Sequence, residues 1–128
     1  MKARRLFMLN SVVTIGYALA FFAATGPLLA VYGITPSAEG IFMGRWFGVG
    51  LLAMGLTTWL TRDAADSSAG RAVARALALS YGVGVALAAW GTLVGPFNQM
   101  GWIAVGFNLL LGAGFAAHVR ARALSPAN

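Results

Sequence analysis

The chain of 128 residues has no cysteine, one histidine and only three acidic residues. The absence of cysteine excludes disulfide bonds, thiolate nucleophiles and cysteine-ligated metals. Hydrolytic or metal chemistry inside a membrane would need carboxylates or a histidine pair at ligand spacing, and the apolar stretches contain neither. We therefore predict a protein that is not an enzyme and that holds no metal or other cofactor.

Charged residues of either sign are scarce as well, at 9% of the chain, whereas a soluble domain carries roughly 25%. Apolar residues make up 59% and gather in four segments close to the roughly 20 residues that cross a bilayer core. These segments lack the two-residue alternation of a barrel strand. The predicted fold is therefore all-α, a four-helix transmembrane bundle forming one integral membrane domain over residues 1–128, with helices at about 6–32, 36–61, 71–94 and 99–118.

Basic residues lie almost entirely at the segment ends on one side of this predicted bundle. Eight of the nine are there, namely Lys2, Arg4, Arg5, Arg62, Arg71, Arg75, Arg120 and Arg122. Short loops rich in Lys and Arg stay cytoplasmic, so we predict a multi-pass membrane protein with both termini in the cytoplasm. The same residues attract anionic lipid headgroups by about 1 kcal/mol each. Because they flank apolar spans, with no interleaved exposed aromatics, we expect no nucleic-acid partner.

Proline and glycine mark the ends and breaks of the predicted helices. Gly26-Pro27 should kink or end the first helix, because proline lacks the N–H that continues the hydrogen-bond ladder. Thr35 and Pro36 favour a helix start, with Thr35 as N-cap and Glu39 in the first turn. The polar stretch 63–70 is expected to be a turn in which Asp66, Ser67 or Ser68 caps the third helix. A second Gly-Pro at 95–96 hints that the chain repeats a helical hairpin.

Small residues recur at every fourth position of three predicted helices. Such ridges let helix backbones approach closely in a membrane, where no hydrophobic drive brings helices together. They predict either packing within the bundle or contacts between copies of the chain. The residues are Gly40, Gly44, Gly48, Ala74, Ala78, Gly82, Ala86, Gly112 and Ala116.

Arg45 is the one formally charged residue inside an apolar stretch, about 6 Å past its start at 1.5 Å per residue. One interpretation is an arginine that snorkels to lipid phosphate or to helix-end carbonyls. The other is a residue that lines an outward-facing pocket and binds an anionic or carbonyl-bearing ligand. Its neighbours in that pocket would be Glu39, Trp46, Asn98, Gln99 and Asn108.

His118 follows the last apolar turn and is expected to lie at the interface, where the helix C-terminus favours a positive charge. A haem or pigment ligand would ordinarily lie within the span. Asn10, Ser11 and Thr14 lie near the same face and are candidates for a small polar cluster.

The segment Gly44-Arg45-Trp46-Phe47-Gly48, continuing as a Gly-rich and Leu-rich run to Leu56, carries a resemblance to a known family. It resembles small bacterial four-helix membrane proteins that are loosely similar to DoxX-like proteins. In that family an arginine in the second helix precedes such a face, whereas an acidic residue of the fourth helix is replaced here by Phe107-Asn108. The resemblance implies the four-helix fold and a location in the bacterial inner (plasma) membrane, and it brings no established activity.

Two functions are compatible with these features. The first is a non-enzymatic membrane protein that self-associates or serves as an accessory subunit of a larger membrane complex. It predicts a tightly packed bundle with no cavity at mid-membrane depth. The alternative is a binder or transporter of a small molecule or anion with an outward-facing site around Arg45, which predicts a polar cavity joining Arg45 to Asn108.

Overall fold

The computed structural model describes residues 3–123, which form four α-helices and one short 3-10 turn. Helix α1 spans Ala3–Val31, α2 spans Ala38–Thr61, the turn η1 spans Arg62–Ala64, α3 spans Ser68–Leu93 and α4 spans Gly101–Ala123. Within residues 3–123 there is no strand, and all four helices are long and apolar enough to cross a membrane. This confirms the predicted all-α, four-helix membrane fold. Lys2 lies outside the described residues, and so does the side chain of Arg122.

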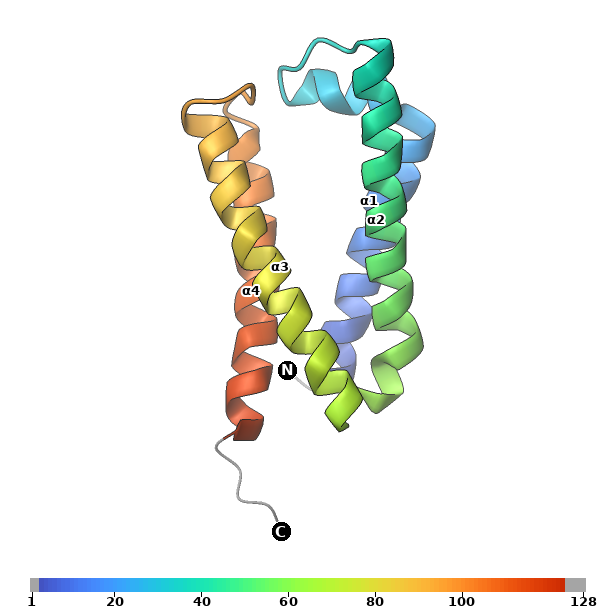
Figure 1. The fold of residues 1–128 in the computed structure, drawn as a ribbon, viewed down its shortest axis with the longest axis vertical. Helices are drawn as coiled ribbons and strands as arrows, with labels where there is room; N and C mark the ends of the chain where they lie inside the picture. Colours follow the sequence, from blue (N-terminus) through green and yellow to red (C-terminus); the bar gives the residue numbers. More distant parts are fainter. Residues whose placement is uncertain (1–2, 124–128) are drawn as a thin grey trace.

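The helices form two hairpins, α1 with α2 and α3 with α4, and pack extensively within each hairpin but sparsely between them. The hairpins converge at the end that carries both termini and the α2–α3 turn, and they diverge at the opposite end (Figure 1). We refer to residues 3–5, 62–71 and 118–121 as the basic end. Residues 32–37 and 94–100 form the loop end. The bundle is therefore a splayed pair of hairpins and lacks the close four-fold packing of a regular bundle.

The hydrophobic core lies toward the basic end, where the hairpins meet. Phe7 of α1 and Phe115 of α4 are fully buried, and their ring centroids are 5.5 Å apart in an edge-to-face arrangement. Tyr81 of α3 stacks on Phe115 at 6.2 Å, so three helices meet on one aromatic group. These contacts join the two hairpins at this end.

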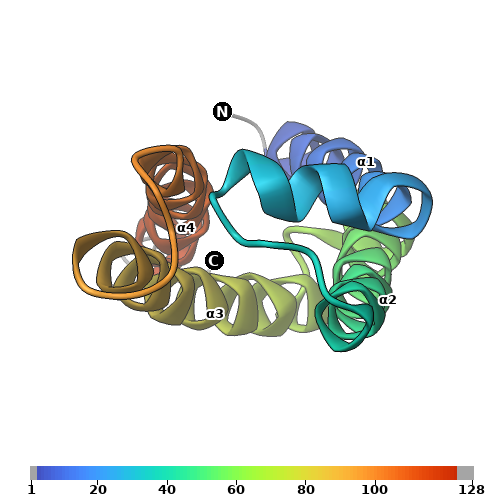
Figure 2. The same cartoon turned by 90° about the horizontal axis from the view of Figure 1, so that it is seen from above.

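The kink predicted from Gly26-Pro27 is present in α1, at Ala24, whose backbone is non-helical at φ −141° and ψ 39°. Pro27 cannot donate to the carbonyl four residues earlier, and its ring crowds that carbonyl, so the helix bends just before the proline. Beyond the kink the chain turns sideways and crosses toward the second hairpin (Figure 2). This segment closes the loop end of the space between the hairpins.

The N-cap predicted for α3 is confirmed, and the N-cap predicted for α2 is wrong. Ser67, one of the three predicted caps, accepts from the backbone N–H of Gly70 at 3.1 Å and begins α3. At α2 the prediction of Thr35 as cap is wrong, because Ser37 holds that position and accepts from Gly40 N at 3.0 Å. Both serines are three residues before their donors, which is the spacing that an N-cap hydroxyl reaches.

Candidate functional site

A cavity of about 740 Å³ lies between the two hairpins and is lined by residues of all four helices. We call it the interhairpin cavity. Most of its wall is apolar, and six side chains bring a hydroxyl or amide to it, namely Thr14, Tyr17, Tyr32, Ser80, Tyr81 and Asn108. Of the described residues that line the cavity, none is Asp, Glu, Lys, Arg or His. The cavity therefore has hydrogen-bonding groups and no formal charge.

The floor of the cavity, toward the basic end, rests on a buried polar network. The Tyr81 hydroxyl donates to Asn10 Oδ1, and Asn10 Nδ2 donates to Thr58 Oγ1 at 3.1 Å. Ser11 Oγ lies 2.8 Å from the same Thr58 oxygen, and Thr14 donates to the Asn10 carbonyl at 2.8 Å. Asn10, Ser11 and Thr58 are fully buried. The expected cluster of Asn10, Ser11 and Thr14 thus exists, and it extends across to α2 and α3.

These hydrogen bonds satisfy the buried polar groups. Within the part of the chain that the structure describes, every buried side-chain nitrogen or oxygen has a hydrogen-bond partner. Buried polar groups in a bilayer are costly unless they are paired, so the network fixes how α1, α2 and α3 meet. Thr14 and Tyr81 belong to both the network and the cavity lining. The hydrogen bonds of the network therefore fix these two side chains of the cavity floor.

Aromatic side chains form the middle and the roof of the cavity. Tyr17 of α1 meets Phe107 of α4 edge to face at 5.9 Å, which joins the hairpins at mid-height. Near the loop end, Tyr32 lies against Phe97 at 5.5 Å. Burial raises the pKa of the Tyr32 phenol above its ordinary value, and the neighbouring Tyr17 adds to the shift. The Tyr32 phenol is therefore neutral and can both donate and accept a hydrogen bond.

Asn108 is the predicted candidate that the structure places in the cavity. Its Nδ2 donates to the Ala104 carbonyl of its own helix at 2.7 Å, so the side chain folds back along α4. A Cβ at Gly84 of α3 would lie 2.1 Å from Asn108 Oδ1, so only glycine admits the amide at this helix crossing. Asn108 is half-buried and partly faces the cavity.

Arg45 does not line the interhairpin cavity, contrary to the predicted pocket that joins Arg45 to Asn108. Phe47, two residues later, does line it. Two helical residues differ by about 200° around the axis, so Arg45 points to the opposite side of α2. The Arg45 side chain is exposed and has no hydrogen bond or ion pair with any residue of the described chain. The expectation of a bundle without a cavity is not met either.

The other predicted ligand residues are dispersed. Trp46 is exposed and meets Phe42 edge to face at 6.4 Å, and Glu39 is exposed in the first turn of α2. Gln99 is exposed in the α3–α4 loop. Neither Glu39 nor Gln99 lines the cavity.

Asn98 connects the two hairpins at the loop end through hydrogen bonds. Its backbone N–H donates to the Tyr32 carbonyl at 2.9 Å, and its Nδ2 donates to the Val31 carbonyl at 3.0 Å. Its Oδ1 accepts from the Met100 N–H at 2.9 Å. The side chain also lies against Gly33, whose φ of 81° favours glycine. Asn98 therefore fastens the crossing segment of α1 to the second hairpin.

The ridges of small residues explain part of the packing. Gly44 and Gly48 are buried against Phe21 of α1, Gly112 packs on Tyr81, and Ala74 is buried in the core. Gly40 lies near Leu29, and Ala78 is partly buried against the core. The remaining three, Gly82, Ala86 and Ala116, are exposed.

Gly82, Ala86 and Ala116 are therefore not packed within the chain, and the alternative of contacts between copies stays a prediction for them. A stripe at every fourth residue rotates by about 40° per step around a helix with 3.6 residues per turn. The inner face of α3 instead alternates steps of three and four residues. Its members are Ala74, Leu77, Tyr81, Gly84, Ala88 and Gly91.

Sequence reasoning missed the tyrosines as site residues. None of Tyr17, Tyr32 and Tyr81 is among the site residues predicted from the sequence. The available signal was the alternation of three and four residues through Leu77, Tyr81 and Gly84, which places Tyr81 on the inner face of α3.

No family model, no curated protein and no solved structure matches this chain. The resemblance to DoxX-like proteins consequently stays a prediction. The functional argument rests on the geometry of the chain itself.

Proposed function

We propose that this protein binds an uncharged lipophilic small molecule in the interhairpin cavity, within the membrane, without transforming it. The observation that carries the proposal is a cavity of about 740 Å³ bounded by all four membrane helices. Sites for small molecules typically measure about 300–1,000 Å³ and combine an apolar wall with a few polar groups. The interhairpin cavity has both properties.

The absence of formal charge in the lining supports an uncharged ligand. An ion moved from water into an apolar site loses its hydration, and this cavity offers no opposite charge to replace it. A hydroxyl or carbonyl group on the ligand would find donors and acceptors at Tyr81 near the floor, at Tyr17 at mid-height and at Tyr32 near the roof. The aromatic wall favours a flat or ring-containing molecule.

A pair of glycines allows a matched test of the proposal. Gly50 of α2 lines the cavity and Gly106 of α4 does not, yet both are exposed and have no atom within 4 Å of an added Cβ. Gly50→Leu adds a side chain to the cavity wall, and Gly106→Leu adds the same side chain elsewhere. In lipid nanodiscs, a neutral aryl diazirine should photolabel cavity residues, and peptide mass spectrometry should locate the label.

We expect the label on the α4 face near Asn108 to fall several-fold in Gly50→Leu and to stay unchanged in Gly106→Leu. An excess of an unreactive neutral lipophile should compete with it, and a cationic analogue should not. Equal labelling of the wild type and both variants would remove the support for a cavity ligand. Native mass spectrometry of protein extracted from membranes would identify a retained natural ligand.

A second candidate function, self-association, is favoured by a separate observation. Gly82 and Ala86 are exposed on α3, and a Cβ at Gly82 would meet nothing within 4 Å. A small residue every fourth position on a lipid-facing surface allows close approach of another helix. In this function the chain would form a homo-oligomer or join a larger membrane complex as a small accessory subunit.

The self-association candidate predicts that Gly82→Leu lowers the oligomer fraction in native mass spectrometry, while Gly106→Leu leaves it unchanged. A monomeric wild-type protein at all protein concentrations in lipid nanodiscs would exclude the homo-oligomer. The cavity proposal would be unaffected, because Gly82 does not line the cavity.

We further propose that the protein lies in the bacterial inner membrane with its basic end on the cytoplasmic side, where its arginines contact lipid headgroups. The proposal is supported by the clustering of basic residues at one end of the spans. Arg45 would then lie near the external surface and extend to headgroups on that side, as its exposed position on α2 favours. Cysteine accessibility scanning at residues 5 and 98 would show which end is cytoplasmic.

A further inference from the structure

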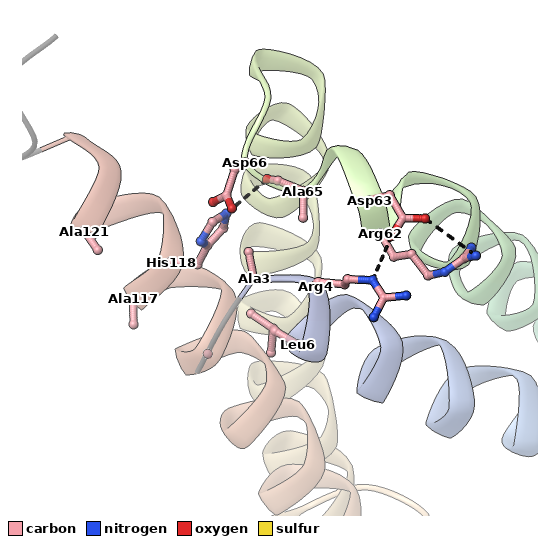
Figure 3. Close-up of a pocket in the computed structure, with 11 residues that line it drawn as sticks. Ala3, Arg4, Leu6, Arg62, Asp63, Ala65, Asp66, Ala117, His118 and Ala121 are labelled. Carbon is pink, nitrogen blue, oxygen red and sulfur yellow. Dashed lines mark hydrogen bonds and ion pairs between the residues drawn. The ribbon is translucent and has the colours of Figure 1, made fainter. Parts of the chain in front are cut away.

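A second pocket of about 860 Å³ lies at the basic end and is separate from the interhairpin cavity. Its base is formed by small or apolar residues of α1 and α4, among them Leu6, Gly114 and Ala117. Its rim carries charged groups from α1 and from the turn that connects α2 to α3. Figure 3 shows these groups on two sides of the pocket, with Arg4, Arg62 and Asp63 on one side and Asp66 and His118 on the other.

The pocket extends from the apolar spans into the zone of the lipid headgroups. Gly114 and Ala121 of α4 both line it and are separated by about 10 Å along the helix at 1.5 Å per residue. The polar layer on each side of a bilayer core is about 5–8 Å thick. The position therefore suits a molecule with an apolar part toward Leu6 and a polar part at the charged rim.

On one side of the rim, two arginines share one carboxylate. Arg4 Nε lies 2.7 Å from Asp63 Oδ1, and Arg62 Nη2 lies 3.6 Å from Asp63 Oδ2. Arg62 also donates to the Trp59 carbonyl and lies over the Trp59 ring. Arg4 uses Nε in its pair, and its two Nη groups have no hydrogen bond within residues 3–123. These Nη groups are suited to the oxygens of a phosphate.

On the other side of the rim are Asp66 and His118 (Figure 3). His118 Nε2 lies 3.3 Å from the Ala65 carbonyl, and its ring meets Phe7 edge to face at 6.5 Å, which fixes the imidazole. A carboxylate has about four acceptor positions, so Asp66 can accept from a ligand in addition to its contacts in the protein. This side is suited to a group with several N–H donors.

We infer that this pocket binds the headgroup of an ethanolamine phospholipid, with the phosphate at Arg4 and the ammonium at Asp66. Among the rim residues that the structure describes there are two guanidinium groups and two carboxylates, so the formal charges of these four groups cancel. A zwitterion with separated charges matches such a rim, whereas an anionic headgroup would place a negative charge near Asp66. A choline headgroup has no N–H to donate, and its recognition usually requires aromatic rings around the cation.

The inference is tested by native mass spectrometry of delipidated full-length protein titrated with phosphatidylethanolamine, phosphatidylcholine or phosphatidylglycerol of identical chains. We expect one molecule of the ethanolamine lipid to be retained with about tenfold preference over each of the others, given that charge-assisted hydrogen bonds decide the selectivity. Retention of the three lipids to equal extents would overturn the inference.

The three acidic residues of the chain provide a matched control. Asp66→Asn should abolish the preference and raise the retention of phosphatidylglycerol, because one negative charge leaves the rim. Glu39→Gln removes the same charge far from the pocket, at the start of α2, and should change nothing. The same effect in both variants would show a general charge effect and would overturn the inference.

A second pair of variants tests the position independently of charge. Ala117 lines the pocket and Ala116 does not, although both are exposed on α4. Ala117→Phe should lower retention of the ethanolamine lipid several-fold, while Ala116→Phe should leave it unchanged. Soluble glycerophosphoethanolamine should fail to displace the lipid, because it lacks the chains that contact the apolar base. Displacement by the soluble headgroup would contradict a lipid site.

Discussion

The close crossing between α1 and α2 at Gly55 allows a quantitative test of the first hairpin. A Cβ added at Gly55 would lie 2.6 Å from Ile15 Cγ1, 2.6 Å from Thr14 Oγ1 and 3.2 Å from the Ile15 backbone nitrogen. Carbon atoms in contact prefer about 3.5–4.0 Å, so Gly55→Ala requires a displacement of about 1 Å. Thr14 is held by its hydrogen bond to the Asn10 carbonyl, and Ile15 is restricted to few rotamers in a helix.

We therefore expect Gly55→Ala to destabilise the protein by about 1–3 kcal/mol, the usual cost of overpacking a well-packed interface. Gly50→Ala is the matched control, because Gly50 is on the same helix and an added Cβ there meets nothing within 4 Å. Its effect should be close to zero. Alanine gains up to about 1 kcal/mol over glycine in a water-exposed helix, but a membrane helix stays largely helical when its neighbours separate.

The assay is reversible unfolding of the two variants in bicelles by steric trapping, which yields the free energy of unfolding directly. A difference of 1–3 kcal/mol corresponds to roughly a 5- to 150-fold change in the unfolding equilibrium. Ile15→Ala should restore part of the loss caused by Gly55→Ala, because it removes Cγ1 from the crossing while Thr14 Oγ1 stays. If Gly55→Ala and Gly50→Ala agree within about 0.5 kcal/mol, the described crossing of α1 and α2 is wrong.

Three further variants test the joints between the hairpins. Tyr81→Phe removes the hydroxyl that donates to Asn10 and should cost about 0.6–1.7 kcal/mol in the same unfolding assay, whereas Thr57→Val, on an exposed surface, should cost nothing measurable. Gly33→Ala places a Cβ at a φ of 81° and should lower stability by about 1–2 kcal/mol, with a gain or no change refuting the left-handed turn. Asn98→Ala removes the side-chain hydrogen bond to the crossing segment of α1. Spin labels on residues 34 and 96 should then report a broader distance distribution. An unaltered distribution would show that this hydrogen bond does not fix the crossing segment.

Local sequence signals were sufficient for the helices and several of their ends. The four apolar segments predicted four spanning helices, because a backbone in lipid must satisfy its hydrogen bonds within one segment. Pro27 predicted the kink of α1, and Ser67 was among the three candidates for the cap of α3. Each of these depends on residues within one or two helical turns of each other, so no knowledge of neighbouring helices was needed.

The position of the candidate site required the tertiary structure. Arg45 drew attention because its charge is unusual in an apolar stretch, but it lies on the face of α2 opposite to Phe47 and the cavity. Tyr17, Tyr32 and Tyr81 are far apart in the sequence, and they line one cavity only because the helices fold into two hairpins.

The sequence by itself thus determined that this chain is a bundle of four membrane helices, where α1 bends, and which end carries the positive charge. The tertiary structure decided which helix faces meet, that the hairpins separate toward the loop end, and that neutral aromatic groups line the resulting cavity. The physical reason is that hydropathy in a membrane no longer distinguishes inside from outside. Lipid-facing and buried positions are equally apolar, so small differences in shape and a few hydrogen bonds select the packing.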